Sequence, residues 1–177
     1  MRVVAGKYRS RPIKAPAGRN TRPTLDQVKE AMFNIIGMKV IDAVVLDLFS
    51  GSGALGIEAL SRGAKKVYFN DQAGSAIATI KDNLKSLGVD EDYEVTKLPY
   101  KERLKSMESQ VDILILDPPY KDKIYEEIIA YMLEHNLLSD RAVIMIESEL
   151  ICEVEPPLNY QKREYKYGNK KLVYLTK

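Results

Sequence analysis

The residues best suited to chemistry in this sequence are carboxylates that follow apolar stretches. The stretch VDILILDPPY, residues 111–120, is a predicted buried strand that ends at Asp117 and continues with Pro118, Pro119 and Tyr120. Proline has no backbone N–H and confines the preceding residue to extended conformations, so the chain must leave the strand in a stiff turn. Asp117 could accept hydrogen bonds from a ligand, or it could merely start a turn and cap the next helix.

A glycine-rich stretch provides a second candidate site. VVLDLFSGSGALG has the spacing Gly51-x-Gly53-x-x-Gly56, directly after a predicted strand and at the start of a predicted helix. Glycines let a ligand approach the backbone closely, and a helix N-terminus offers N–H groups to polar or anionic atoms. The spacing alone is a weak signal, but it predicts nucleoside binding.

Two acids near this loop indicate the kind of nucleoside. Asp71 follows the next strand, where an acid can accept hydrogen bonds from a ribose diol, although it could also cap a helix. Asp47 lies four residues before Gly51, where a carboxylate suits an ammonium group better than a pyrophosphate. An amino acid nucleoside is therefore expected, with its reaction partner near Asp117.

The order of predicted elements defines the fold class. Apolar strands alternate with helical patterns and end in a hairpin around Gly168-Asn169, which predicts a doubly wound, mostly parallel, seven-stranded Rossmann-like α/β sheet with a C-terminal antiparallel hairpin. The predicted strands are 43–48, 66–70, 93–97, 111–116, 142–147 and the hairpin strands YQKREYKY and KKLVYLTK; the predicted helices are 25–36, 54–62, 73–87, 100–108 and 122–135.

The first residues differ from this pattern. Residues 1–24 read as a short strand, a turn and an extended arm, ordered by the core or by a partner, and residues 25–177 as the single main domain. Residues 1–24 carry a charge of +7 and residues 161–177 carry +5, whereas residues 25–160 carry −10. Basic ends on an acidic body suggest a polyanionic partner, with solubilising tails as the plainer alternative.

Composition excludes several classes of protein. One cysteine, Cys152, and one histidine, His135, exclude an internal disulfide and argue against a metal site. Cys152 is most simply an inert filler and His135 a helix-end donor, while Glu58 reads as a solvated helix residue or a partner for the basic arm. No apolar run approaches a membrane span and no signal peptide begins the chain, so a cytoplasmic protein is expected.

Together these motifs resemble class I S-adenosylmethionine-dependent methyltransferases. LDLFSGSGALGIEA resembles their first motif, FND ending at Asp71 their ribose-binding acid, and DPPY the motif of enzymes that methylate exocyclic or amide nitrogens. RVVAGKYRSR, TRPTLDQVKEAMFNII, ALSRGA and IES-Glu149 resemble more narrowly the bacterial small-subunit (16S) ribosomal RNA guanine-N2 methyltransferases of the RsmD family. This likeness covers nearly the whole chain.

The resemblance implies roles for individual residues. Asp117 and the Pro118 carbonyl would bind the guanine amine, with Pro119 completing the turn and Tyr120 stacking on the extruded base. S-adenosylmethionine would contact Asp47, Phe49, Ser50, Gly51, Ser52, Gly53, Asp71 and Gln72. RNA phosphates would contact Arg2, Lys7, Arg9, Arg11 and Arg22.

The sequence departs from the wider class after the third strand, where KLPYKERL replaces the usual acidic or amide residue beside the adenine. The implied partner is small-subunit ribosomal RNA in an assembled or assembling subunit, with no metal and no membrane. The alternatives are an adenine-N6 or protein-amide methyltransferase, a catalytically silent RNA-binding assembly module and, less favoured, a nicotinamide-dependent oxidoreductase.

Overall fold

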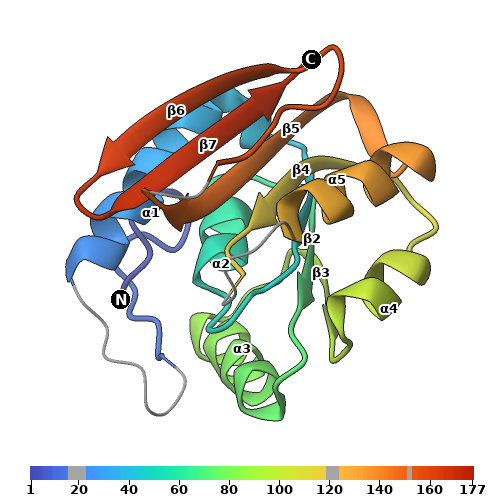
Figure 1. Ribbon diagram of the computed structural model, residues 1–177. Coiled ribbons are helices and arrows are strands. Elements are labelled where there is room, and N and C mark those ends of the chain that lie inside the picture. Colours follow the sequence, from blue (N-terminus) through green and yellow to red (C-terminus); the bar gives the residue numbers. More distant parts are fainter. Residues whose placement is uncertain (16–22, 119–123, 151–152) are drawn as a thin grey trace.

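The computed structural model describes residues 1–15, 23–118, 124–150 and 153–177. Its centre is one seven-stranded sheet flanked by helices, as predicted (Figure 1). No helix within these ranges is both long and apolar enough to span a membrane.

The sheet is parallel through its first five strands and antiparallel at its C-terminal edge. The strand order is β3-β2-β1-β4-β5-β7-β6, so the chain order reverses between β1 and β4. Ligands collect at such a reversal, outside the carboxyl ends of the strands. The strands are β1 (Val44–Asp47), β2 (Lys66–Asn70), β3 (Asp92–Thr96), β4 (Val111–Leu116), β5 (Leu138–Glu149), β6 (Gln161–Tyr167) and β7 (Lys170–Thr176).

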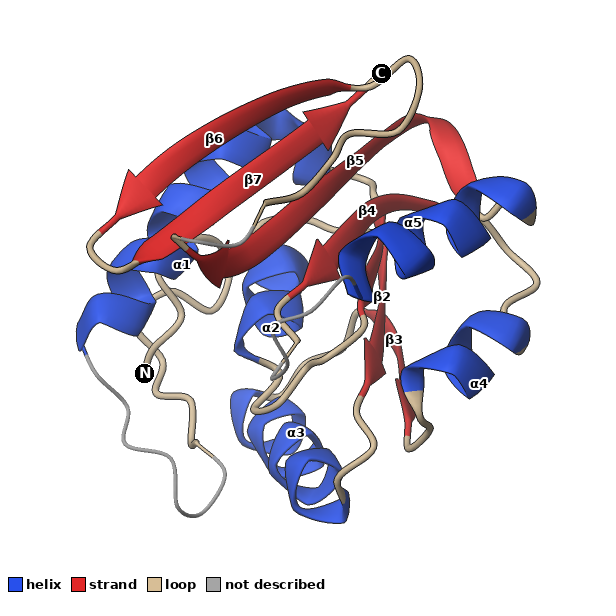
Figure 2. Cartoon of the chain, viewed as in Figure 1, coloured by secondary structure: helices blue, strands red, loops and turns tan. Residues whose placement is uncertain are grey.

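Helices cover both faces of this sheet (Figure 2). One apolar core forms beneath α1 (Pro23–Ile36), α2 (Ala54–Ser61) and α3 (Gly74–Leu87), and a second beneath α4 (Tyr100–Lys105) and α5 (Ile124–Glu134). A short 3-10 helix, Gly37–Val40, follows α1. Successive strand residues point into opposite cores: Val45 packs in the core beneath α1, α2 and α3, and Leu46 in the core beneath α4 and α5. This alternation explains why the central strands are apolar throughout.

The N-terminal segment packs on the body of the protein. Val3, Tyr8 and Ile13 are buried in the core beneath α1, α2 and α3. Residues 1–15 form only an isolated antiparallel bridge between Arg2 and Pro12, rather than the short strand that the sequence suggests.

The reason for this difference is a carboxylate on α2. The backbone N–H groups of Val4 and Ala5 donate to Glu58 at 2.8 and 3.0 Å, in place of a neighbouring strand. Glu58 also forms ion pairs with Lys29 at 3.2 Å and Arg62 at 2.8 Å and is fully buried. The expectation of a solvated Glu58 is therefore wrong, and its alternative role as a partner for the arm is confirmed.

Strand β5 is longer than predicted because its first residues do not look like a buried strand. The register between β4 and β5 shifts between Val111 and Ile113, which lets the polar residues Ser139, Asp140 and Arg141 join the strand. Asp112 lies at this irregularity and accepts hydrogen bonds from the Val44 N–H, the Ser139 hydroxyl and the Arg141 guanidinium. The Val44 N–H belongs to β1, whose pairing with β4 begins only at Val45, and Asp112 satisfies this N–H group.

Candidate functional site

Three of the predicted site acids lie at the carboxyl edge of three adjacent strands. Asp47 is the last residue of β1, Asp71 directly follows β2, and Asp117 directly follows β4. Strand β1 lies between the other two, with Asp47 in register with Phe69 and Ile115. Asp71 and Asp117 therefore each lie two residues beyond the level of Asp47, on either side of it.

Asp47 is buried beneath the glycine loop. Its side chain is 1% exposed and its Oδ2 accepts a hydrogen bond of 3.1 Å from the backbone N–H of Gly56. Burial raises the pKa of Asp47 to about 7, and the negative charge of Asp71 adds to this effect, while the Gly56 N–H opposes it. A ligand cation would restore the charged form, so this carboxylate is suited to an ammonium group.

Asp71 connects the glycine loop after β1 with the turn between β2 and α3. Its Oδ2 accepts from the Gly51 N–H at 3.0 Å, and its Oδ1 accepts from the Ala73 N–H at 2.9 Å, just before α3. The plainer prediction of a helix cap is wrong, because Ala73 is itself the N-cap of α3 and the helix has no side-chain cap hydrogen bond. Each carboxylate oxygen can accept a further hydrogen bond, so the two contacts of Asp71 leave acceptor capacity for a ribose diol. Gln72, between the two contacts, is exposed.

The rest of the glycine loop is held by buried polar contacts. The Ser50 hydroxyl donates to the Asp47 carbonyl at 2.7 Å and accepts from the Asn70 N–H at 3.1 Å. The Ser52 carbonyl accepts from the Asn83 side chain at 2.9 Å. Gly53 is the N-cap of α2.

Gly56 sets the distance between α2 and the sheet. A Cβ atom at this position would lie 2.2 Å from the ring of Phe69. Only glycine allows this close approach, which is the role that the third glycine has in the dinucleotide fingerprint. The approach also brings the Gly56 N–H within reach of Asp47.

Phe49, which precedes the first glycine of the loop by two residues, contributes an aromatic side chain to the candidate site. It is half-buried, and its ring centre lies 5.8 Å from that of Tyr100, at the start of α4, in a tilted arrangement. Tyr100 belongs to the KLPYKERL stretch that departs from the wider class. Beside it the Leu98 carbonyl accepts from the Asn70 side chain at 3.1 Å. Aromatic packing at this position suits a flat ring such as adenine.

The acidic turn after β4 is only partly described. Asp117 and Pro118 are half-buried at the edge of the sheet. Pro119 and Tyr120 lie outside the described residues, and so does Cys152. His135 is exposed at the end of α5 and stacks on Tyr131 with ring centres 3.9 Å apart.

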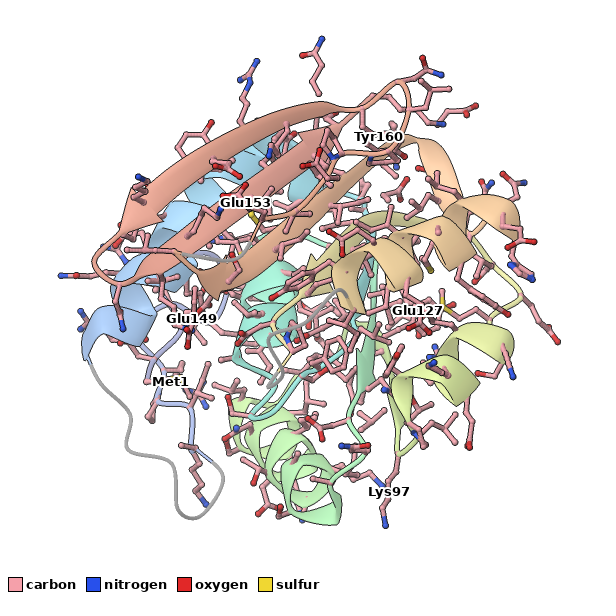
Figure 3. The ribbon with its side chains drawn as sticks, viewed as in Figure 1. Met1, Lys97, Glu127, Glu149, Glu153 and Tyr160 are labelled. Atoms are coloured by element: carbon pink, nitrogen blue, oxygen red, sulfur yellow. The ribbon has the colours of Figure 1, made fainter. Side chains whose placement is uncertain are left out.

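Sequence reasoning missed two residues beside Asp117. Glu147 lies in β5 and is almost fully buried, and Lys170 of β7 reaches it with 3.2 Å between Nζ and Oε1. Glu149 ends the same strand (Figure 3). The signal was available, because a glutamate in the otherwise apolar run AVIMIE is costly unless it is paired.

The basic arm has several partners within the protein. Lys7 pairs with Asp90 and Glu91, and these contacts, led by Asp90, raise its pKa. The Arg11 guanidinium donates to the Ser86 carbonyl at 2.8 Å, whereas Arg9 is exposed. The Arg2 side chain is also exposed, and Arg22 lies outside the described residues. The phosphate-binding role of these residues stays a prediction.

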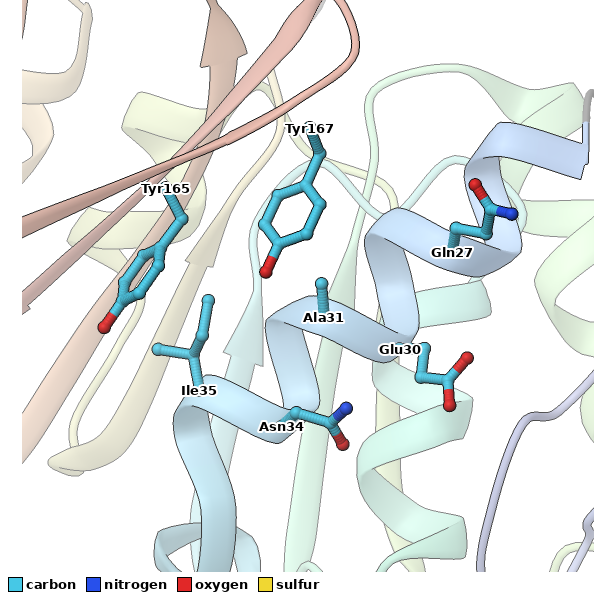
Figure 4. A pocket seen from close by; sticks show the side chains of 7 residues that line it. All are labelled: Gln27, Glu30, Ala31, Asn34, Ile35, Tyr165 and Tyr167. Atoms are coloured by element: carbon cyan, nitrogen blue, oxygen red, sulfur yellow. The ribbon is translucent and has the colours of Figure 1, made fainter.

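A groove of about 540 Å³ lies between α1 and β6, away from the three acids. Tyr165 and Tyr167 point from β6 toward α1 across it (Figure 4). Its lining contains none of the residues predicted for catalysis, cofactor or RNA; it consists of Gln27, Glu30, Ala31, Asn34, Ile35, Tyr165 and Tyr167.

The acids and the loop together fit S-adenosylmethionine. Asp47 is a desolvated carboxylate that a ligand ammonium would stabilise in its charged form. Asp71 offers acceptors for a diol, and Phe49 offers an aromatic surface. These are the three kinds of group that an amino acid nucleoside presents: an ammonium, a ribose and a base.

Comparisons with known proteins show the family of this chain. The sequence model of the family described as "Conserved hypothetical protein 95" matches residues 1–176. The inferred rRNA methyltransferase YlbH of Bacillus subtilis is 40% identical over 89% of this chain and 86% of its own. Ribosomal RNA small subunit methyltransferase D of Haemophilus influenzae is 37% identical over 90% of this chain and 84% of its own.

A solved structure of a relative has the same fold. The inferred methyltransferase yhhF of Escherichia coli superimposes with a TM-score of 0.87 at 31% identity, covering 100% of this chain and 97% of that one. The expected fold and enzyme class are thereby confirmed. The chain belongs to the "Conserved hypothetical protein 95" family, which is the RsmD family of methyltransferases.

Proposed function

We propose that this enzyme transfers a methyl group from S-adenosylmethionine to the exocyclic N2 of a guanine in small-subunit ribosomal RNA. The observation that carries the proposal is the position of Asp117, at the same sheet edge as Asp47 and Asp71, the acids predicted to bind the cofactor. The curated relatives named ribosomal RNA small subunit methyltransferase D support the choice of substrate.

The target amine needs help from the protein because its lone pair is conjugated with the guanine ring. When bound, S-adenosylmethionine supplies an electrophilic methyl group on a sulfonium. Asp117 and the Pro118 carbonyl accept hydrogen bonds from the amine and turn its lone pair toward that methyl group. Positioning and electrostatics then carry the catalysis, without a covalent enzyme intermediate.

The step balances without a further reactant. The amine nitrogen gains a C–N bond as the C–S bond breaks, and the electron pair of the broken bond goes to sulfur. The nitrogen is positively charged until it loses a proton to water. The carboxylate of Asp117 stabilises that charge while it lasts.

Tyr120 stacks on the extruded base in this proposal, and the basic N-terminal segment contacts phosphates near it. Exposed Arg9 is better placed for this than Lys7, which is paired with Asp90 and Glu91. Specificity comes from the shape of the folded RNA loop. The substrate is an assembled or assembling subunit in the cytoplasm, where the folded loop is present.

The proposal is tested by transfer of labelled methyl from S-adenosylmethionine to unmodified small subunits and to naked ribosomal RNA. Wild-type protein is compared with Asp117→Ala, after both are shown to bind S-adenosylhomocysteine equally. Label in RNA that depends on Asp117 supports the proposal, and the preferred form of RNA gives the assembly stage. Label in ribosomal protein instead of RNA would overturn it.

A further inference from the structure

The register of β4 and β5 places a second carboxylate beside Asp117. The last paired residues of the two strands are Leu116 and Ile146, so Asp117 and Glu147 follow at the same level. Leu116 and Ile146 face the core beneath α4 and α5. Since strand side chains alternate, Glu147 points to the opposite face, and Asp117, which directly follows β4, is close enough to Lys170 on that face to raise its pKa. Neighbouring strands are about 4.8 Å apart.

Lys170 completes this group from β7. It is in register with Glu149, and its Nζ lies 3.2 Å from Glu147 Oε1, with the Glu147 side chain 7% exposed and Lys170 33% exposed. Burial by itself would lower the pKa of Lys170, but Glu147, Asp117 and Glu149 together raise it. The Lys170 ammonium thus interacts electrostatically with three carboxylates, and one of them, Asp117, is the predicted acceptor for the guanine amine.

The two partners of this ion pair have opposite effects on Asp117. Lys170 favours the ionised form of Asp117, which is the form that accepts two hydrogen bonds from an amine. A lysine bound directly to Asp117 would, however, compete with that amine for the same oxygens. Glu147 prevents this competition, because it holds the ammonium by a nearly buried contact of its own.

The balance of charge also suits the reaction. Asp117, Glu147 and Lys170 together carry one net negative charge when all three are ionised. That charge is complementary to the positive charge that develops on the target nitrogen. Lys170 without Glu147 would neutralise Asp117 and remove this complementarity.

We propose that Lys170 and Glu147 are positioning residues for Asp117: Lys170 keeps Asp117 ionised, and Glu147 keeps Lys170 from occupying the acceptor oxygens. This inference rests on the proposed methyl transfer. Among the described residues, the charged groups that share this face with Asp117 at the ends of the neighbouring strands are Asp47, Asp71, Glu147, Glu149 and Lys170. Lys170 is the cation in that set.

Substitutions at Lys170 and at Glu147 should change the pH profile of kcat for methyl transfer to RNA in different ways. In Lys170→Met, Asp117 loses the favourable charge of Lys170 and keeps its acidic neighbours, so the acid limb of the kcat profile moves to higher pH by about 1–3 units and activity recovers above that limb. In Glu147→Gln, Lys170 turns to Asp117, so kcat falls by about tenfold or more and raising the pH to 9 does not restore it. Lys170→Arg keeps the charge and the wild-type profile.

The controls separate this role from a structural one. Lys166→Met removes an exposed lysine from the same hairpin and leaves the profile unchanged. Affinity for S-adenosylhomocysteine stays at the wild-type value in every variant, which shows that the fold and the cofactor site persist. If one variant fails to fold, the other still decides, because each has its own predicted profile.

Two kinds of failure are distinguishable. If Lys170→Met or Glu147→Gln lowers only the melting temperature and keeps the wild-type pH profile and kcat, the inference is wrong while the proposed function stands. If wild-type protein transfers no methyl to RNA, the proposed function is wrong, and the inference is wrong with it.

Discussion

We expect Asp47 to make cofactor affinity depend on pH near neutrality. Its pKa is raised to about 7 by burial, so only the ionised fraction can pair with the ammonium of a ligand. Affinity for S-adenosylhomocysteine should fall about tenfold from pH 8 to pH 6, following that fraction. Calorimetric titration across this range measures it, and Asp47→Asn should bind weakly with no such dependence. A flat wild-type profile would contradict the role of Asp47.

The raised pKa of Asp47 has the opposite effect on the stability of the free protein, which should fall as pH rises. A carboxyl whose pKa is higher in the folded state binds its proton more tightly there, so its contribution to stability is present at acidic pH and lost as pH rises through about 7. The unfolding free energy of Asp47→Asn should lack this decline. Denaturant titrations of both proteins between pH 5 and about 8 compare the slopes; equal slopes would contradict the shift.

At the scale of elements, the N-terminal segment is attached to α2 at Gly6. Gly6 has φ of +81°, and a Cβ there would lie 1.8 Å from the Ser61 carbonyl oxygen. Gly37 has φ of +59° with nothing within 4 Å of its Cβ position, so Gly37→Ala isolates the cost of the backbone conformation. We expect about 1 kcal/mol for Gly37→Ala and about 2–4 kcal/mol for Gly6→Ala. Equal costs in chemical denaturation would show that the close contact relaxes freely.

A buried charge network joins the same segment to α1 and α2. Glu58 holds Lys29, whose side chain is 3% exposed and whose pKa is lowered by burial despite that carboxylate. Glu58→Gln leaves the lysine without its carboxylate partner and should cost about 3–5 kcal/mol in unfolding free energy. The double variant Glu58→Gln, Lys29→Met should lose less than the sum of the two single changes. Additive losses would rule out a coupled pair.

For the molecule as a whole, the asymmetry of charge bears on RNA binding. Each phosphate contact by a basic side chain contributes about 0.7–0.9 to the slope of log affinity against log salt. Arg9→Ala should reduce that slope by about one contact, whereas Lys7→Ala should change it little because Lys7 already pairs with Asp90 and Glu91. Binding of small subunits or ribosomal RNA at several salt concentrations measures both. Equal reductions would show that Lys7 leaves its acidic partners on binding.

Most of the architecture could be predicted because it depends on local patterns. Apolar runs, helical periodicity and the Gly168-Asn169 turn define elements that the structure reproduces within a few residues. The start of β5 could not be predicted, because its polar residues join the sheet only through the bulge at Asp112. Contacts between distant residues were also invisible, such as the arm on Glu58.

Part of the candidate site could also be predicted from the sequence, and part could not. Asp47, Asp71 and Asp117 each follow an apolar strand, and parallel strands bring their carboxyl ends to one edge, so their proximity followed from sequence. The pairing of Glu147 with Lys170 depends on the register of β5 against an antiparallel β7. A register is a property of the folded sheet, which composition and spacing do not specify.

The most direct test of the account is the identity of the methylated nucleoside. Small-subunit RNA treated with the enzyme and S-adenosylmethionine is digested to nucleosides and analysed by mass spectrometry, with Asp117→Ala in parallel. We expect N2-methylguanosine in the wild-type reaction and none in the Asp117→Ala reaction. N6-methyladenosine would keep the amine chemistry but contradict the substrate, and N2-methylguanosine at wild-type levels with Asp117→Ala would contradict the mechanism.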